Sequence, residues 1–277
     1  MNADRQALKR SARMVLMAIL LGAETGLLAG PPFRTDDPEP VALGHAEFYV
    51  AWTGFRTPGG QAMAAPLLEF NYGLLPNLQF HVVAPYVQVK PDGEAWSRGY
   101  GDTEIGLKYR FIEEHACLPQ VGIFPMVEVP TGKAERGLGA GHTVVYLPIW
   151  LQKSFGKWTT YGGYGWWRNP GEGQRNWSYT GWLLQREVSE SFTFGGEVFR
   201  ATASSWEGKA SVGWNLGAII NMNEQHHILV SAGKNASGPT ETHYYLGYQL
   251  TFTPGTMTFN RMGRTPQAPT AGSLRLD

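Results

Sequence analysis

The chain has 277 residues, and its 23 Lys and Arg balance its 23 Asp and Glu, so the formal charge at pH 7 is zero. This balance excludes the basic footprint of a nucleic-acid-binding protein, and one all-β domain accounts for the length. Only 17% of the residues are charged, against roughly 25% in soluble domains, whereas 13% are aromatic and 35 are Gly. We therefore expect many turns and an apolar outer surface. A lone cysteine, Cys117, excludes a disulfide within the chain.

Residues 1–30 resemble an export signal. Basic side chains at Arg5, Lys9, Arg10 and Arg13 precede an apolar run at residues 14–21. This run is too short to span a bilayer, which takes about 20 residues. We predict a signal peptide that is cleaved on export, although no clean motif marks the cleavage site. The alternative is an uncleaved helix at the start of a cytosolic protein.

Residues 31–44 are rich in proline, which cannot donate to a strand ladder. We predict a periplasmic segment here, or a plug that enters the lumen of the domain that follows.

From residue 45 to residue 252, short runs alternate between apolar and polar side chains, which is typical of strands that face two environments. No later segment offers about 20 apolar residues without Gly, Pro or charge, so membrane-spanning helices are excluded. The sequence predicts an all-β fold: an antiparallel transmembrane β-barrel of about 12 strands over residues 45–252. The expected strands are 45–55, 65–75, 78–90, 102–112, 119–130, 142–155, 158–168, 176–187, 191–201, 208–221, 226–234 and 242–252. Residues 253–277 are rich in Thr, Pro and Gly and are expected to form a disordered tail.

The lengths of the links between these strands also alternate. The expected short links are 76–77, 113–118, 156–157, 188–190 and 222–225. The expected long links are 56–64, 91–101, 131–141, 169–175, 202–207 and 235–241. Short turns at one rim and longer loops at the other are typical of outer-membrane barrels, and an even strand number places both termini at the short-turn, periplasmic rim.

The positions of the charged residues indicate which face of each strand points to the lumen. In the fourth strand, Ile105, Leu107 and Tyr109 share one side, and Lys108 and Arg110 share the other. Because a Lys or Arg that faces lipid costs roughly 2–4 kcal/mol, the charged side should face the lumen. The same argument, with a one-residue register error as its main risk, assigns these side chains to the lumen: Glu69, Asn71, His81, Glu104, Lys108, Arg110, Glu128, Gln152, Glu197, Asn215 and Gln249.

Aromatic residues gather near the strand ends, where girdles at the two membrane interfaces are expected. Those near the long links are Trp96, Tyr100, Trp166, Trp167, Trp177, Tyr179 and Trp206; those near the short links are Phe111, Phe155, Trp158, Phe192 and Phe252. The last strand alternates up to Phe252 and resembles the terminal-strand signal of outer-membrane proteins, although that signal normally closes the chain. The expected partners are outer-membrane lipids, the barrel assembly machinery and an unknown small solute, with no nucleic acid.

No motif for catalysis, a metal or a cofactor stands out. Residues 130–133 lack the upstream glycine spacing of a phosphate loop, and the run from Glu113 to Cys117 matches no tetrahedral metal site. The stretch at His142 lacks the serine that lipolytic barrels carry two residues after a histidine. We therefore expect no enzyme, no metal and no cofactor.

Four stretches resemble one known family: residues 30–40 (GPPFRTDDPEP), 101–111 (GDTEIGLKYRF), 128–132 (EVPTG) and 162–171 (GGYGWWRNPG). They are similar to the "MetA-pathway of phenol degradation" outer-membrane family, whose members are often called transporters. The resemblance covers roughly residues 30–250. It implies a barrel and a passage role near aromatic-compound metabolism, and it carries over no binding residues.

These observations favour a passive channel or transporter for small solutes, with hydrophobic or aromatic compounds as candidates, in the outer membrane of a Gram-negative bacterium. Eight-stranded barrels are filled by their own side chains and 16 to 18 strands leave an open channel, so a pore of about 12 strands should be narrow. One alternative is a structural or adhesion-type barrel that transports nothing. Another is a secreted soluble barrel with a ligand cavity, which the apolar outer face disfavours.

Overall fold

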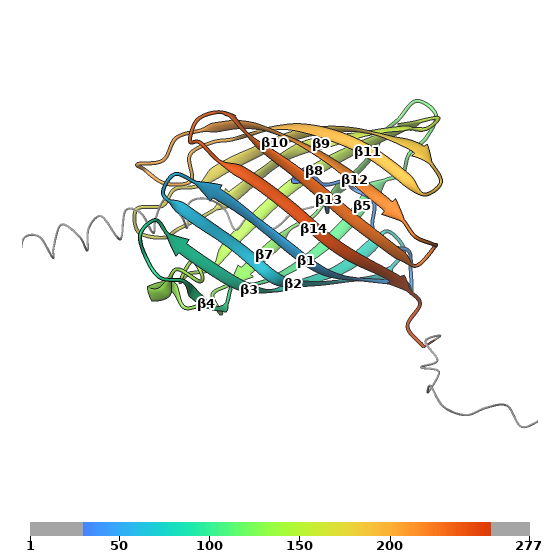
Figure 1. The fold of residues 1–277 in the computed structure, drawn as a ribbon. Helices are drawn as coiled ribbons and strands as arrows, with labels where there is room; N and C mark the ends of the chain where they lie inside the picture. The colour runs from blue at the N-terminus through green and yellow to red at the C-terminus, as the bar shows by residue number, and fades with distance from the viewer. Residues whose placement is uncertain (1–29, 256–277) are drawn as a thin grey trace, which may run out of the picture.

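The structure, a computed structural model, describes residues 30–255. The chain forms one closed antiparallel barrel (Figure 1). Its strands are β1 (Ala46–Thr57), β2 (Gly60–Leu75), β3 (Leu78–Pro91), β4 (Ser97–Tyr100), β5 (Thr103–Ile112), β6 (Gln120–Ile123), β7 (Met126–Val129), β8 (Val144–Phe155), β9 (Trp158–Arg168), β10 (Trp177–Ser189), β11 (Phe192–Ala201), β12 (Ser211–Asn221), β13 (His226–Ser237) and β14 (Thr242–Phe252). A single 3-10 turn, η1 (Ala134–Arg136), lies between β7 and β8. Within residues 30–255 no helix is long and apolar enough to cross a membrane.

The wall closes where β14 pairs with β1, from Ala46 opposite Phe252 to Arg56 opposite Thr242. Two positions in the wall are each occupied by a pair of short strands. Both β4 and β5 pair with β3, and both β6 and β7 lie between β5 and β8. The barrel therefore has 12 wall positions, which confirms the predicted fold class.

The two interruptions were not predicted, and each has a local cause. Between β4 and β5, the Asp102 carboxylate accepts hydrogen bonds from Gly132 N (2.9 Å) and Ala140 N (2.6 Å). Between β6 and β7, Pro125 has no N–H for a ladder, but its carbonyl oxygen still accepts a hydrogen bond from Leu107 N at 3.1 Å. The predicted strand 119–130 is therefore broken into β6 and β7, whereas the predicted strand 102–112 is continuous as β5 and the short β4 lies within the predicted link 91–101.

The two faces of the wall differ as the alternation predicts. On β5, Ile105 and Leu107 are 42% and 44% exposed, whereas Glu104 and Lys108 are 1% and 5% exposed. Because successive side chains of a strand point to opposite faces, exposed apolar side chains cover the outside and polar ones face the interior.

The two rims differ in the length of their links. One rim has the links 76–77, 113–119, 156–157, 190–191 and 222–225. The other has the links 58–59, 92–96, 130–143, 169–176, 202–210 and 238–241. The expected link 56–64 was wrong: β1 and β2 extend to a pair between Thr57 and Gly60, so only two residues turn. The start of β1 and the end of β14 lie together at the short-turn rim (Figure 1).

The predicted signal peptide, residues 1–30, and the predicted tail, residues 253–277, lie outside the described residues except for Gly30 and residues 253–255.

Candidate functional site

The segment formed by residues 30–44, here called the N-terminal segment, lies inside the barrel. It enters at the short-turn rim, where Gly44 N donates to Gly73 O at 2.9 Å. Further inside, Val41 N donates to the side-chain oxygen of Gln79 on β3 at 2.8 Å. Its backbone donors thus find partners on the barrel wall, as buried N–H groups must.

The middle of the segment is held by charge. Lys108 Nζ on β5 lies 3.0 Å from Asp36 Oδ1 and 3.7 Å from Asp37 Oδ1. Asp36 is 1% exposed and Lys108 is 5% exposed, so the pair is removed from solvent. Nearer the short-turn rim, Glu39 accepts a hydrogen bond from Gln120 Nε2 at 3.2 Å and lies 3.7 Å from Arg110 Nη1.

The inner end of the segment is bound by one carboxylate. Glu197 on β11 accepts hydrogen bonds from Arg34 N and Thr35 N, each at 2.8 Å, and from Asn215 Nδ2 at 3.1 Å. Ser231 donates to the carbonyl oxygen of Pro32. Hydrogen bonds to a charged acceptor are about twice as strong as neutral ones, so Glu197 fixes the tip of the segment firmly.

Glycines on the inner wall make room for the segment. A Cβ at Gly181 would stand 2.1 Å from Thr35 Oγ1, and a Cβ at Gly73 would stand 2.1 Å from the carbonyl oxygen of Ala42. Phe33 is 1% exposed and packs with Tyr161 and Leu183. The wall and the segment therefore fit at van der Waals contact, which a side chain at either glycine would prevent.

A second network links side chains of the wall itself. Asn71 Nδ2 donates to Glu69 Oε1 at 2.9 Å, so Asn71 Oδ1 accepts the hydrogen bond of 2.7 Å from His81 Nδ1. The other ring nitrogen, Nε2, lies 2.9 Å from Glu104 Oε1. Because Nδ1 uses its proton to donate to Asn71, the hydrogen bond between His81 Nε2 and Glu104 Oε1 needs a further proton, which either the ring nitrogen or the carboxyl group carries.

The eleven side chains that the sequence assigns to the lumen all lie on the inner side of their strands. Eight are buried: Glu69, Asn71, His81, Glu104, Lys108, Gln152, Glu197 and Asn215. The half-buried ones are Arg110, Glu128 and Gln249. Several contact the N-terminal segment rather than open space: Lys108, Arg110, Gln152 and Glu197. The structure brings Glu69, Asn71, His81 and Glu104 together in the wall network.

Sequence reasoning missed several wall side chains that contact the segment: Gln79, Gln120, Tyr179 and Ser231. It also misplaced three aromatic side chains: Trp167, Trp177 and Tyr179 are 6%, 6% and 4% exposed and point inward, not to a membrane interface. Trp167 and Trp177 occupy paired positions on β9 and β10, and their rings stack with centroids 5.1 Å apart. This cross-strand stack fills the inner side of the wall.

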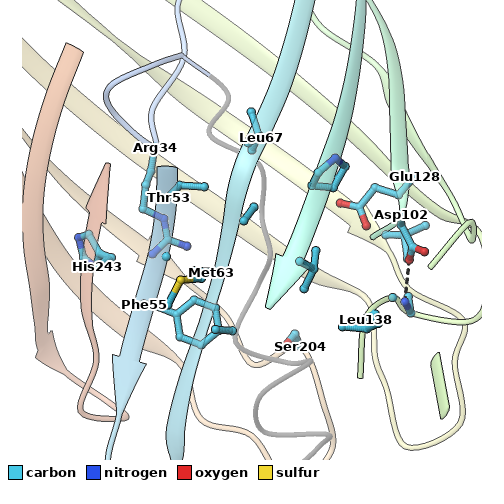
Figure 2. Close-up of a pocket in the computed structure, with 18 of the residues that line it drawn as sticks. Arg34, Thr53, Phe55, Met63, Leu67, Asp102, Glu128, Leu138, Ser204 and His243 are labelled. Carbon is cyan, nitrogen blue, oxygen red and sulfur yellow. Dashed lines mark hydrogen bonds between the residues drawn. The ribbon is translucent and has the colours of Figure 1, made fainter. Parts of the chain in front are cut away.

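A cavity lies beyond the tip of the N-terminal segment, toward the long-loop rim (Figure 2). Its free space, counted with the part open to solvent, is ≈ 1430 Å³. Arg34 forms part of its floor, with the guanidinium 4.6 Å from the centroid of the Phe199 ring and 3.6 Å from Glu241 Oε1. Phe55, Leu67 and Leu138 supply an apolar side.

Polar residues lie at two ends of the lining, Asp102 and Glu128 at one and His243 at the other (Figure 2), and the loop 130–143 contributes Leu138 and Ala140. Leu138 of this loop is 3% exposed, and the hydrogen bond from Ala140 N to Asp102 holds the loop against the barrel (Figure 2). Among residues 30–255 no group of three or more His, Cys, Asp or Glu is arranged to hold a metal ion. The geometry provides a binding space with one closed end.

No known protein family matches the amino-acid sequence, and no curated protein matches it either. Solved structures do resemble the fold. An outer membrane channel from Pseudomonas putida F1 superposes with a TM-score of 0.63 at 16% identity, over 78% of this chain and 98% of that chain. The KdgM porin, solved with disordered oligogalacturonate, superposes with a TM-score of 0.53 at 10% identity, over 74% of this chain and 99% of that chain.

The translocator domain of the autotransporter NalP from Neisseria meningitidis gives a TM-score of 0.50 at 10% identity, over 90% of this chain and 98% of that chain. At such identities these likenesses show the fold alone. A fold shared by channels and a translocator leaves the function to be argued from the site.

Proposed function

We propose that this barrel spans the bacterial outer membrane and acts as a passive channel for small solutes, with the N-terminal segment as a resident plug. The membrane location is supported by the outer face, where large apolar side chains such as Leu147, Trp182 and Val198 are 48%, 52% and 62% exposed. A soluble barrel would hold such a surface in water at a large cost, whereas lipid accepts it.

The observation that carries the channel proposal is the cavity. It is open toward the long-loop rim and ends on Arg34, so a solute that enters is stopped by the plug and not by the wall. Below Arg34 the interior is occupied by the plug down to the short-turn rim, where Gly44 contacts Gly73. Passage therefore requires the plug to move, or a narrow path beside it.

The lining supports a finer proposal, that the solutes are hydrophobic or aromatic compounds. The apolar lining made by Phe55, Leu67 and Leu138 would contact such a molecule, while Glu128 and His243, which lie on either side of it, would bind polar substituents. The resemblance of residues 30–40 and 162–171 to outer-membrane proteins of phenol degradation points in the same direction.

The rival proposal is a structural barrel that transports nothing, and the firm anchoring of the plug by Glu197 and Lys108 favours it. Liposome swelling separates the two. We expect vesicles that contain the folded full-length protein to swell with the smallest uncharged sugars and polyols, at a rate that falls to the background as the solute grows, because the path beside the plug is narrow.

The controls are vesicles without protein and vesicles with a variant that lacks residues 31–44, which should swell with larger solutes as well. If neither the folded full-length protein nor the deletion variant admits any solute, the channel proposal fails and the structural barrel is favoured.

A further inference from the structure

The outer face of the barrel carries charge of one sign at its long-loop rim. The charged strand residues that point outward there are all basic, each within three residues of the long-loop end of its strand: Arg56 on β1, Lys90 on β3, Arg98 on β4, Arg168 on β9, Arg200 on β11 and Lys234 on β13. Their direction follows from the alternation: Arg168 and Arg200 are exposed, whereas Trp167 and Phe199 beside them are 6% and 2% exposed. We call these six residues the basic belt.

The carboxylates of the strands do not share this surface, and those of the long links, such as Asp92 and Glu207, lie beyond the strand ends. Among the described strands, the acidic residues on the inner face are Glu47, Glu69, Glu104, Glu128 and Glu197. The remaining one, Glu187, lies at the opposite rim near the end of β10. Random placement of six strand carboxylates would put some of them outside, so the outer face is selectively basic.

The belt also keeps its charge available. Within residues 30–255, Arg168, Arg200 and Lys234 form no ion pair or hydrogen bond with a carboxylate. At the short-turn rim, by contrast, the outward Lys153 lies 3.0 Å from Glu114 Oε1, and the outward Arg186 packs on the Trp158 ring with its guanidinium 5.2 Å from the centroid. A cation without a partner next to an apolar surface is a ready site for an anion.

The belt lies just beyond the apolar band. On the outer side of β9 the side chains run from Tyr164, which is 47% exposed, through the half-exposed Trp166 to Arg168 at the strand end. Trp and Tyr mark the headgroup level of a bilayer, so a cation one step further along the strand meets the charged part of the lipids. On β11 the outward side chains also change from apolar to basic toward the long-loop rim, from Val198 to Arg200.

We propose that the basic belt binds the phosphate groups of anionic lipid headgroups in the leaflet around the long-loop rim. Guanidinium groups bind phosphate oxygens through two parallel hydrogen bonds, which suits Arg168 and Arg200. Lys234 adds a point charge two strands from Arg200, at roughly 10 Å by the spacing of strands. The proposal rests on the membrane location given above and not on the passage of any solute.

Quenching of tryptophan fluorescence by brominated lipids tests this proposal with the full-length protein in vesicles. The probe is brominated phosphatidic acid, compared with brominated phosphatidylcholine of the same chain length. We expect wild-type protein to prefer phosphatidic acid, and the variants R168Q, R200Q and K234Q to lose about fivefold of that preference for each side chain removed. The combined triple variant should show almost no preference for phosphatidic acid, and high salt should weaken the preference of the wild type.

The matched control is the variant K153Q, which removes an outward cation of the short-turn rim that is already paired with Glu114. It should keep the wild-type preference. Equal preference in the wild type and the triple variant would overturn the belt proposal, as would an equal loss in the control. Absence of quenching by either lipid would instead show that the barrel does not insert, which refutes the membrane location itself.

Discussion

Removal of residues 31–44 is expected to raise the single-channel conductance in planar bilayers severalfold. These residues fill the barrel interior between the short-turn rim and Arg34, where their backbone and carboxylates contact Gly73, Lys108 and Glu197. Without the segment, the polar side chains that bind it would line an opened path, narrow because twelve strands lie between the filled barrels of eight and the open ones of 16 to 18. Conductance histograms of the wild type and of the deletion variant, each recorded from single insertions, measure the effect.

A variant that replaces residues 31–44 with an equally long Gly and Ser segment separates loss of anchoring from loss of chain. The conductance of this variant should switch rapidly between a low and a high level. Its segment is long enough to fill the lumen but lacks Asp36 and Glu39, which bind Lys108 and Gln120. If the deletion leaves the conductance at the wild-type level, the N-terminal segment is not a plug.

In the proposed channel, Lys108→Met is expected to produce long open events, which the docked plug makes rare in the wild type. The substitution leaves Asp36 buried without its 3.0 Å partner. Removal of one member of a buried ion pair costs about 3–5 kcal/mol. This cost destabilises the docked state of the plug, because the barrel wall closes without the plug, and so the docked fraction should fall relative to the undocked one by about 10²- to 4 × 10³-fold. The measurement is the ratio of open to closed dwell times.

Two further variants control this prediction. Lys153→Met breaks an ion pair of the same length with Glu114, but the two side chains are 31% and 25% exposed. An exposed pair contributes about 0–1 kcal/mol, so the dwell times should stay at the wild-type values. The double variant K108M/D36L removes both charges and should restore the closed state in part. Equal dwell times in Lys108→Met and the wild type would contradict the anchoring role of Lys108.

The strands could be predicted from the sequence because most of them alternate cleanly. The bounds of β9 and β14 match the predicted 158–168 and 242–252. The first part of β2 was missed: residues 62–65 are all apolar, with Met63 among three alanines, so they show no alternation, and the register shifts between Ala64 and Leu67, beside Pro66. An apolar run without contrast does not show which residue faces inward.

Charge predicted the inner side chains better than aromaticity did. In a barrel with an apolar outer face, a charged side chain such as Lys108 or Glu197 is destabilising when it points outward, and both point inward. An aromatic ring is acceptable on either face, and so Trp167 and Trp177 were placed at an interface although they stack inside. The contacts of the N-terminal segment were not predictable, because Thr35 and Glu197 are 162 residues apart and no local pattern relates them.

The most direct test of the account is whether the N-terminal segment is protected from reagents in water. Thr35 is 0% exposed inside the barrel, whereas the side chain of Glu39 in the same segment is 57% exposed. In a Cys117→Ser background, the thiol of T35C should stay unlabelled by a water-soluble maleimide while the barrel is folded and inserted, and should be labelled after denaturation. The thiol of E39C should be labelled in both states. Rapid labelling of T35C in the folded, inserted barrel would contradict a lumen occupied by residues 30–44.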